Sequence, residues 1–248
     1  MRVPGGYEEF RVGTTRGIAR PAAREFAAAA IGSHGSLGDW AAKHATRILA
    51  GRTAAHVIDA PEGPWVVRHY VRGGGAAKLL GDRYLRVAPP RPFRELVTSA
   101  RALAAGIATP EVMVATASAE GVFRRGDIAT RFVPDSATLA DITFGETRRA
   151  EAERLAAWEA AGRCVRDAAR NGLVHADLNL RNILVAGPPD APRTLLLDLD
   201  RCRFTHAPQA THLPAMARRL HRSARRFVER HAQPVDTELM AFDRGTHD

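Results

Sequence analysis

The sequence predicts an α+β fold in two parts, a sheet-rich first part and a mainly helical second part. Short apolar runs separated by Gly and Pro fill residues 46–71, with a turn at Pro61–Pro64. Such spacing is typical of an antiparallel meander. After Pro134–Ser136 the pattern changes to a long amphipathic helix, followed by short strands and a basic helix. We therefore divide the chain into a first lobe at 36–134 and a second lobe at 135–248.

The first lobe closes with a helix and two strands. Pro92 is a favourable first residue for a helix that runs to about Ala105. Strand-like runs follow at 111–116 and 127–133. Residues 1–35 are rich in Gly, Ala and Arg and show weak periodicity. We expect a tail or a short peripheral helix there.

The second lobe opens with a helix over about 146–171. Its apolar residues recur at steps of three and four: Leu155, Trp158, Gly162, Val165 and Ala169. This periodicity predicts one stripe that faces a core rather than a cofactor. Two short strands at 183–185 and 195–197 follow, and a basic helix at about 214–230 ends the pattern.

Composition narrows the class of protein without deciding it. The 248 residues carry a net charge of +9, which suits nucleic acid, nucleotide phosphates or an anionic membrane as partner. Most basic residues are arginines, so charge alone does not choose among these. The 2 cysteines fit a reducing compartment. No apolar run reaches the roughly 20 residues of a membrane span, and we expect a cytoplasmic protein.

The strongest chemical signal is His175-Ala176-Asp177 with Asn182 five residues after the aspartate. Asp198 follows at the end of the next strand candidate. This order matches the catalytic loop and the metal-binding aspartate of kinases. Asp and Asn also commonly cap turns. The joint pattern of helix, loop, strand, turn and strand favours the kinase interpretation, and predicts a protein-kinase-like two-lobed fold with a reduced helical second lobe.

Phosphoryl transfer needs the residue types that this pattern supplies. Asp177 would orient and deprotonate the attacking hydroxyl. Asn182 and Asp198 would offer hard oxygen ligands to Mg²⁺, with ATP bound between the lobes. His175 is expected to hold the backbone of the loop. Asp200 could assist Asp198 or bind Arg201, and we choose Asp198 as the metal ligand.

The nucleotide-binding residues of the first lobe follow a less regular pattern. Gly51 occupies the place of the phosphate-covering loop, which has one glycine here instead of three. Arg68 stands where kinases carry a lysine, and arginine keeps the charge while gripping phosphate as a fork. Glu95, early on the following helix, is the expected ion-pair partner of Arg68. An ordinary exposed helix glutamate is the alternative for Glu95.

Several segments resemble the lipopolysaccharide kinase family, and within it the 3-deoxy-D-manno-octulosonic acid (Kdo) kinases. The segments are Trp65–Tyr70 with Arg72-Gly73-Gly74, Lys78–Tyr84, Pro92–Glu95, Arg125–Thr130, His175–Asn179 with Asn182–Leu184, and Leu197–Arg201. The resemblance covers about 46–204. His56-Val57 and Leu199 depart from the aromatic residues that the family pattern leads us to expect.

The resemblance implies transfer of the ATP γ-phosphate to a Kdo hydroxyl on a lipid A precursor. It also implies a peripheral location on the cytoplasmic face of the inner membrane. Arg72, Lys78 and Arg83 would then meet the carboxylate and phosphates of the substrate, or the anionic surface that presents them. A solvated basic loop is the alternative for this segment. We do not expect nucleic acid as a partner.

Three other functions remain open at this point. A protein or RNA-associated kinase would make more of the surplus charge, but we expect too little room after Asp198 for a full activation segment and peptide platform. A kinase of another sugar or small molecule, such as a heptose or an aminoglycoside, would keep the same catalytic residues. A non-catalytic pseudokinase would serve as a binding module, but the joint presence of Asp177, Asn182 and Asp198 weighs against it.

Overall fold

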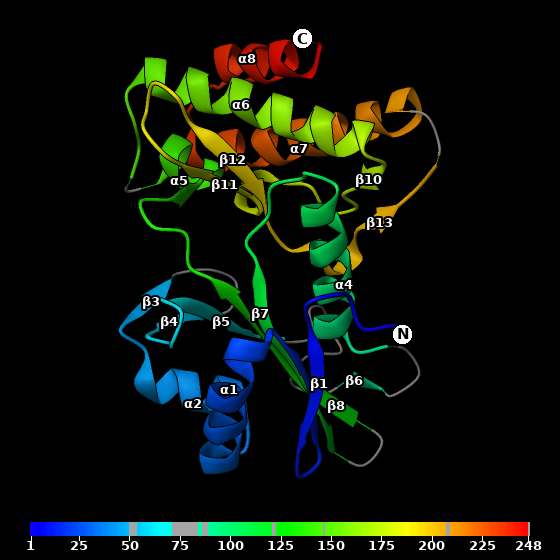
Figure 1. The fold of residues 1–248 in the computed structure, drawn as a ribbon. Coiled ribbons are helices and arrows are strands. Elements are labelled where there is room, and N and C mark those ends of the chain that lie inside the picture. Colours follow the sequence, from blue (N-terminus) through cyan, green and yellow to red (C-terminus); the bar gives the residue numbers. More distant parts are fainter. Residues whose placement is uncertain are drawn as a thin grey trace. The chain divides into compact units, whose positions relative to one another are not determined.

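The computed structural model of the chain describes residues 1–49, 54–70, 84–85, 89–120, 123–145, 147–206 and 209–247 (Figure 1). It forms two compact units. The sheet unit comprises Met1–Arg101 and Glu111–Phe132, and the helical unit comprises Ala102–Pro110 and Val133–Asp248. The predicted α+β class is confirmed, with an antiparallel sheet in the first unit and mainly helices in the second.

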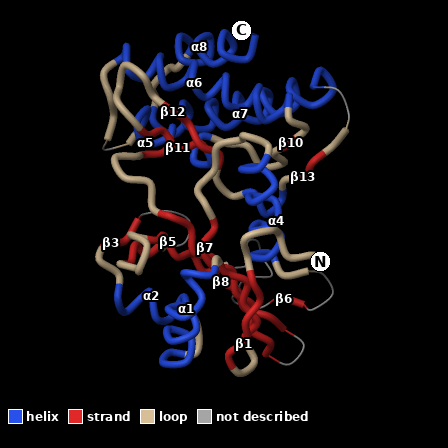
Figure 2. The backbone as a smooth tube through the Cα atoms, viewed as in Figure 1, coloured by secondary structure: helices blue, strands red, loops and turns tan. Residues whose placement is uncertain are grey.

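One antiparallel sheet organises the sheet unit (Figure 2). Its strands are β1 (Glu8–Val12), β2 (Thr15–Ala19), β3 (Arg47–Leu49), β4 (Ala55–Ile58), β5 (Trp65–His69), β6 (Tyr84–Leu85), β7 (Val112–Glu120) and β8 (Phe123–Arg131). They follow the order β1-β2-β7-β8-β5-β4-β3, and β6 pairs with β8. The neighbours β5 and β8 place His69 opposite Asp127.

The N-terminal segment differs from the expected tail or peripheral helix. Residues 8–19 form the hairpin of β1 and β2, and β2 pairs with β7 from Thr15 to Ala19. The following helix α1 (Pro21–His34) buries alanines, whose small side chains give little hydrophobic periodicity in the sequence. Pairing with a strand nearly a hundred residues away determines this structure, and no local pattern reports it.

Helices cover both faces of the sheet. On one face, α1 and α2 (Leu37–His44) pack against Ile58, Trp65 and Val67. On the other face, α4 (Arg91–Ala104) contributes Phe93 and Leu96 to a cluster with residues of the sheet. Because successive strand residues point to opposite faces, Arg68 and Tyr70 share the α4 face of β5. The helix and the strand therefore bring their polar residues together.

The helical unit contains a short hairpin framed by helices. The helices are α5 (Leu139–Phe144), α6 (Glu151–Arg170), α7 (Gln209–His231) and α8 (Asp236–His247). The strands are β9 (Ala137–Thr138), β10 (Leu173–Val174), β11 (Ile183–Ala186), β12 (Arg193–Leu196) and β13 (Arg203–Phe204). Short 3₁₀ helices η1 (Leu180–Asn182) and η2 (Leu199–Arg201) flank the hairpin of β11 and β12.

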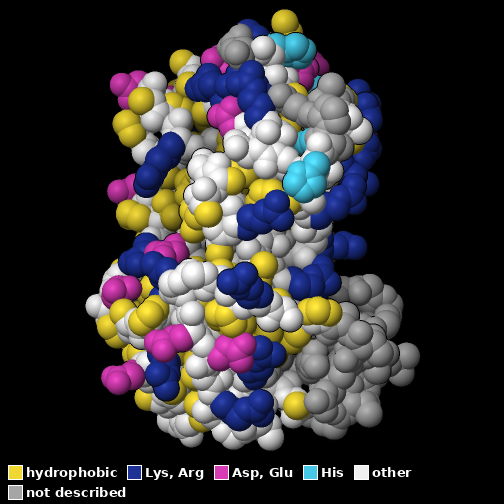
Figure 3. Space-filling view, turned by 45° about the vertical axis from the view of Figure 1, so that its right-hand side comes forward, with side chains coloured by type: hydrophobic (Ala, Val, Ile, Leu, Met, Phe, Trp, Pro, Cys, Tyr) yellow, Lys and Arg dark blue, Asp and Glu magenta, His cyan; other side chains and the backbone are white. Residues whose placement is uncertain are grey.

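The surface reflects the positive net charge of the sequence. On the face drawn in Figure 3, Lys and Arg side chains are spread over both units and outnumber those of Asp and Glu. No helix among the described residues combines the length and the apolar character that crossing a membrane requires.

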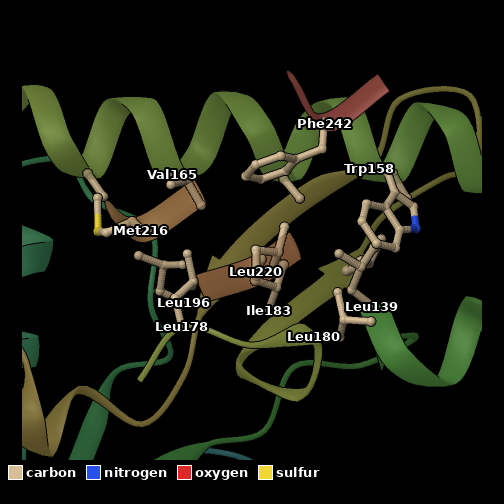
Figure 4. Close-up of a cluster of buried hydrophobic side chains, with 14 of the residues drawn as sticks. Leu139, Trp158, Val165, Leu178, Leu180, Ile183, Leu196, Met216, Leu220 and Phe242 are labelled. Atoms are coloured by element: carbon tan, nitrogen blue, oxygen red, sulfur yellow. The ribbon is translucent and has the colours of Figure 1, made fainter. Parts of the chain in front are cut away.

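The predicted apolar stripe of α6 lies in the core of the helical unit (Figure 4). Trp158 and Val165 are at most 1% exposed, and Leu180, Ile183 and Leu220 pack in the same cluster. The neighbours come from η1, which carries the end of the His175–Asn182 segment, from β11, which follows it, and from α7. The core therefore fixes the backbone from which that motif projects.

Two glycines allow α6 and α8 to pack in close contact. A Cβ atom at Gly162 would overlap with the carbonyl oxygen of Phe242, and one at Gly245 would overlap with that of Glu159. These obstacles are backbone atoms, so rotation of a side chain cannot relieve the overlap. Helix α8 was not predicted from the sequence, and its backbone explains the glycine within the α6 stripe.

We expect Gly162→Ala to lower the free energy of unfolding by about 2 to 3 kcal/mol, as overpacking does in other cores. The control is Gly32→Ala in α1, where nothing lies within 4 Å of an added Cβ. That change should leave stability equal or raise it by up to about 1 kcal/mol. Urea unfolding of both variants measures the difference. Equal stability of Gly162→Ala and the wild type would contradict the close packing of α6 on α8.

Candidate active site

Two asparagine side chains fix the backbone at Asp177. The side-chain amides of Asn179 and Asn182 each donate a hydrogen bond of 2.9 Å to the Asp177 carbonyl oxygen. Asn179 Oδ1 also accepts from the Arg181 amide at 3.0 Å, which caps η1. The Asp177 side chain is exposed and has no hydrogen-bond or ion-pair partner among the described residues. The loop therefore fixes the backbone of Asp177, while its carboxylate stays exposed to solvent.

The hairpin of β11 and β12 brings Asn182 and Asp198 to the same end. Asn182 precedes β11, Asp198 follows β12, and the Leu197 amide donates to the Asn182 carbonyl at 2.9 Å. Asp198 has a left-handed backbone, with φ 60° and ψ 57°. Aspartate tolerates this conformation better than most residues. Its side chain is half-buried, whereas Asp200 is 2% exposed.

His175 connects the loop to the hairpin, whereas the sequence predicts that it holds the backbone of the loop itself. Its Nε2 atom lies 2.9 Å from the Leu197 carbonyl oxygen, one residue before Asp198. A carbonyl only accepts, so Nε2 carries the proton of the neutral ring. His175 is 1% exposed, and its Nδ1 atom has no hydrogen-bond partner within the described part of the chain. The ring is a structural support and is shielded from solvent.

The inner face of α7 also supports the catalytic loop. The His175 amide donates to the Met216 sulfur at 3.1 Å, and the Leu180 amide donates to Ser223 Oγ at 3.3 Å. The Arg181 guanidinium lies 5.4 Å from the centre of the Phe227 ring. These contacts hold the loop from both ends of the motif, although α7 follows it in the chain.

Burial lowers the pKa of His175 below its ordinary value of 6.5. The influences that raise it are smaller: the hydrogen bond to Leu197 and the carboxylates of Asp198, Asp177 and Asp200. The unfolded chain then binds more protons than the folded chain once the pH falls below about 6.5. The contribution of the neutral His175 ring to stability is therefore fully present above that pH. It is lost as the pH falls toward the lowered pKa of His175 in the folded chain.

A His175→Gln variant should lose less stability than the wild type between pH 7.5 and pH 5. Glutamine can donate to the Leu197 carbonyl but does not titrate. Below pH 6.5, the free energy of unfolding of the wild type should fall more steeply than that of the variant, by an amount that approaches about 1.4 kcal/mol per pH unit. Urea unfolding at both pH values gives the difference for each protein. Parallel losses in the two proteins would show that His175 titrates as it does in the unfolded chain.

The loop residues have the donor chemistry that Mg²⁺ requires. Asn182 Nδ2 is engaged by the Asp177 carbonyl, so its Oδ1 atom is the oxygen left to bind a ligand. The Asp198 carboxylate offers a second hard ligand. Among the described residues, no group of three or more His, Cys, Asp or Glu side chains forms a cage for a metal ion.

In the sheet unit, the structure brings Arg68 and Glu95 together as expected from the sequence. Arg68 Nη2 lies 2.6 Å from Glu95 Oε1. The Tyr70 hydroxyl donates to the other oxygen, Oε2. The Glu95 side chain is 4% exposed and that of Arg68 is 30% exposed, so the arginine is the member of the pair that reaches solvent.

Some predicted residues lie outside the described part of the chain. These are Gly51 of the expected phosphate-covering loop and the expected substrate-binding residues Arg72, Lys78 and Arg83. The strands on either side of Gly51, β3 and β4, pair with each other, and Leu49 lies opposite Ala55.

Sequence reasoning missed residues that support the site, among them Asn179, Tyr70 and Ser223. Asn179 could have been found, because an asparagine side chain often accepts from the backbone amide two residues further on in an Asx turn, here that of Arg181. Tyr70 stands in the family-like segment with Arg68, but only the structure shows its contact with Glu95. Ser223 lies far along the chain in α7 and gave no local signal.

Comparisons with known proteins identify the family of the chain. Residues 39–238 match the model of the Lipopolysaccharide kinase (Kdo/WaaP) family. A 3-deoxy-D-manno-octulosonic acid kinase of Stenotrophomonas maltophilia (strain R551-3) is 34% identical over 224 residues, which are 84% of each chain. One of Xanthomonas euvesicatoria pv. vesicatoria (strain 85-10) is 32% identical over 197 residues, covering 78% of this chain and 75% of its own.

A solved structure supports the fold. The structure described as WaaP in complex with acyl carrier protein matches with a TM-score of 0.51 at 17% identity. The match covers 83% of this chain and 80% of that chain, and it confirms the protein-kinase-like fold. With the family model and the Kdo kinase relatives, it also confirms the resemblance found in the sequence. The chain is therefore a phosphotransferase that belongs to the lipopolysaccharide kinase (Kdo/WaaP) family.

Proposed function

We propose that this protein transfers the γ-phosphate of ATP, with Mg²⁺, to a hydroxyl of Kdo on a lipid A precursor. The observation that carries the proposal is the catalytic loop, which holds Asp177, Asn182 and Asp198 around one hairpin end. The acceptor is supported by relatives named Kdo kinase that match over most of the chain.

Asp177 acts on the acceptor hydroxyl. Its exposed carboxylate accepts the hydroxyl proton as that oxygen attacks the γ-phosphorus, and ADP leaves. Asn182 Oδ1 and the Asp198 carboxylate would hold Mg²⁺. Bound Mg²⁺ would neutralise charge on the phosphates.

In the sheet unit, Arg68 binds the phosphates and Glu95 orients its guanidinium. Arginine is suited to this role because its planar fork can engage two phosphate oxygens. Gly51 would let the backbone of the covering loop approach the phosphates. Arg72, Lys78 and Arg83 would bind the carboxylate and phosphates of the acceptor.

The acceptor is tested with two forms of one lipid A precursor, with and without Kdo. We expect wild-type protein to transfer labelled phosphate from ATP only to the Kdo-bearing form, and only with Mg²⁺. Transfer to a heptose or an aminoglycoside and not to the Kdo-bearing precursor would reassign the acceptor and leave the chemistry intact. Absence of ATP binding would remove the proposal.

We further propose that the protein lies at the anionic cytoplasmic face of the inner membrane through α7. Five arginines of α7 are exposed, and none of them forms an ion pair with another described residue: Arg218, Arg222, Arg225, Arg226 and Arg230. Glu229 is the one acidic residue of this helix. Since α7 also supports the catalytic loop, lipid binding would bring that loop to a membrane-borne acceptor.

Vesicle sedimentation tests the membrane proposal. Each arginine near an anionic bilayer strengthens binding roughly fivefold. The combined change Arg218→Gln, Arg222→Gln and Arg225→Gln should therefore weaken binding to phosphatidylglycerol vesicles about 100-fold. Three substitutions at exposed arginines elsewhere in the helical unit, Arg170, Arg193 and Arg244, serve as the charge-matched control. Equal losses in both triple variants would contradict a role specific to α7.

A further inference from the structure

The side of α7 that contacts the catalytic loop carries an arginine that the proposed chemistry does not use. Arg219 is half-buried, its Nη1 atom is buried, and its guanidinium has no hydrogen-bond or ion-pair partner among the described residues. Arg181 of the loop is exposed, and within the described chain its guanidinium also forms no hydrogen bond or ion pair. We propose that Arg181 and Arg219 bind anionic groups of the acceptor beside Asp177. The inference rests on the proposed function and adds a binding site for the acceptor in the helical unit.

Two contacts fix the place of Arg219 beside the loop. Met216 accepts a hydrogen bond from the His175 amide, and Ser223 accepts one from the Leu180 amide. Positions 216, 219 and 223 are separated by three and four residues, so they follow one side of α7. Arg219 therefore lies on the turn of α7 that runs alongside residues 175–180, the stretch that contains Asp177.

Arg181 is held at the other end of the same stretch. It belongs to η1, four residues after Asp177, and its guanidinium lies 5.4 Å from the centre of the Phe227 ring. The Phe227 ring is itself held by the Phe144 ring, with their centroids 5.3 Å apart. An aromatic face attracts a guanidinium without accepting its N–H groups in ordinary hydrogen bonds. The contact therefore orients Arg181 and leaves its donors to bind a ligand.

The charges beside the loop favour an anionic ligand. Arginine stays protonated in proteins, and a buried N–H group without an acceptor is costly. Glu229, the one acidic residue of α7, lies ten residues beyond Arg219, or about 15 Å along the helix. A carboxylate or a phosphate would supply the missing acceptors, and a guanidinium fork binds either group. The proposed acceptor carries both groups.

Steady-state kinetics with the Kdo-bearing lipid A precursor in uncharged detergent micelles tests the inference without an anionic bilayer. We expect Arg181→Gln and Arg219→Gln each to raise the KM for this acceptor about tenfold, the effect of losing a hydrogen bond to a charged group. Arg219→Lys keeps the charge and should raise the KM less. The KM for ATP, and kcat at saturating acceptor, should change less than about twofold, because only acceptor binding is weakened.

Arg193→Gln is the matched control. Arg193 is an exposed arginine of the same unit that forms no ion pair with another described residue, and it lies at the end of the β11–β12 hairpin opposite Asn182. Its acceptor KM should equal that of the wild type. An unchanged acceptor KM in Arg181→Gln and Arg219→Gln would overturn the inference. A fall in kcat alone would also overturn it, because the two arginines would then support the loop without binding the acceptor.

Sedimentation with phosphatidylglycerol vesicles separates acceptor binding from binding to lipid headgroups. Arg218, Arg222 and Arg225, which the membrane proposal uses, follow the side of α7 turned away from the loop. Arg181→Gln and Arg219→Gln should therefore bind vesicles as the wild type does. Weaker vesicle binding with an unchanged acceptor KM would assign both arginines to lipid and overturn the inference. Absence of transfer by the wild type would instead defeat the proposed function, and it is read from the wild type alone.

Discussion

Replacement of Asp177 by asparagine is expected to reduce kcat for phosphate transfer about 100- to 10,000-fold, the range for loss of a general base. Asparagine has nearly the same shape but cannot accept the proton of the acceptor hydroxyl. The clamp from Asn179 and Asn182 acts on the backbone carbonyl of residue 177 and survives the change. The Kd for Mg²⁺-ATP should therefore stay within about twofold of the wild type, and the loss should appear in kcat.

Steady-state kinetics and calorimetry with the same protein preparation measure these quantities. Asp190→Asn is the matched control, because Asp190 is an exposed aspartate of the same unit in the turn after β11. It should retain wild-type kcat. An Asp177→Asn variant with more than a tenth of wild-type kcat would contradict the role of Asp177 as the base.

Replacement of Asp198 by asparagine should have the second large effect, a loss of about 100-fold or more in kcat at ordinary Mg²⁺ concentrations. The change removes the negative charge from the proposed metal ligand. Asparagine tolerates the left-handed backbone of this position, so the hairpin should keep its geometry. The Mg²⁺ concentration for half-maximal activity should rise, and excess Mg²⁺ should restore part of the activity.

Titration of activity with Mg²⁺ at fixed ATP measures this shift. Asp135→Asn is a fitting control, since Asp135 is also left-handed, with φ 49°, and is exposed in the same unit. Its Mg²⁺ dependence should match the wild type. An unchanged half-maximal Mg²⁺ concentration in Asp198→Asn would contradict Asp198 as the metal ligand. Asp200 would then be the next candidate.

The arrangement of the candidate catalytic loop was predictable because its residues follow a local sequence pattern. His175, Asp177 and Asn182 have fixed spacing in the chain, and two strands of a hairpin suffice to bring Asp198 close. The pair of Arg68 and Glu95 was also predictable, since a strand followed by a helix is the usual origin of that contact in kinases.

Features that depend on distant contacts were not predictable. The strands at residues 8–19 depend on pairing with β7, and their own residues give a weak pattern. Helix α8 follows Pro234 and opens with Asp236, which are start signals, but its packing against Gly162 could not be read from them. The contact of the Tyr70 hydroxyl with Glu95 depends on the packing of α4 against the sheet and gave no local signal.

The most direct test of the account is transfer of labelled γ-phosphate from ATP to a Kdo-bearing lipid A precursor, with wild type and Asp177→Asn side by side. The account predicts Mg²⁺-dependent label on the Kdo moiety with the wild type and its near-complete loss in the variant, with ATP binding equal in both. Label transferred equally by both proteins, or none with the wild type despite ATP binding, would contradict it.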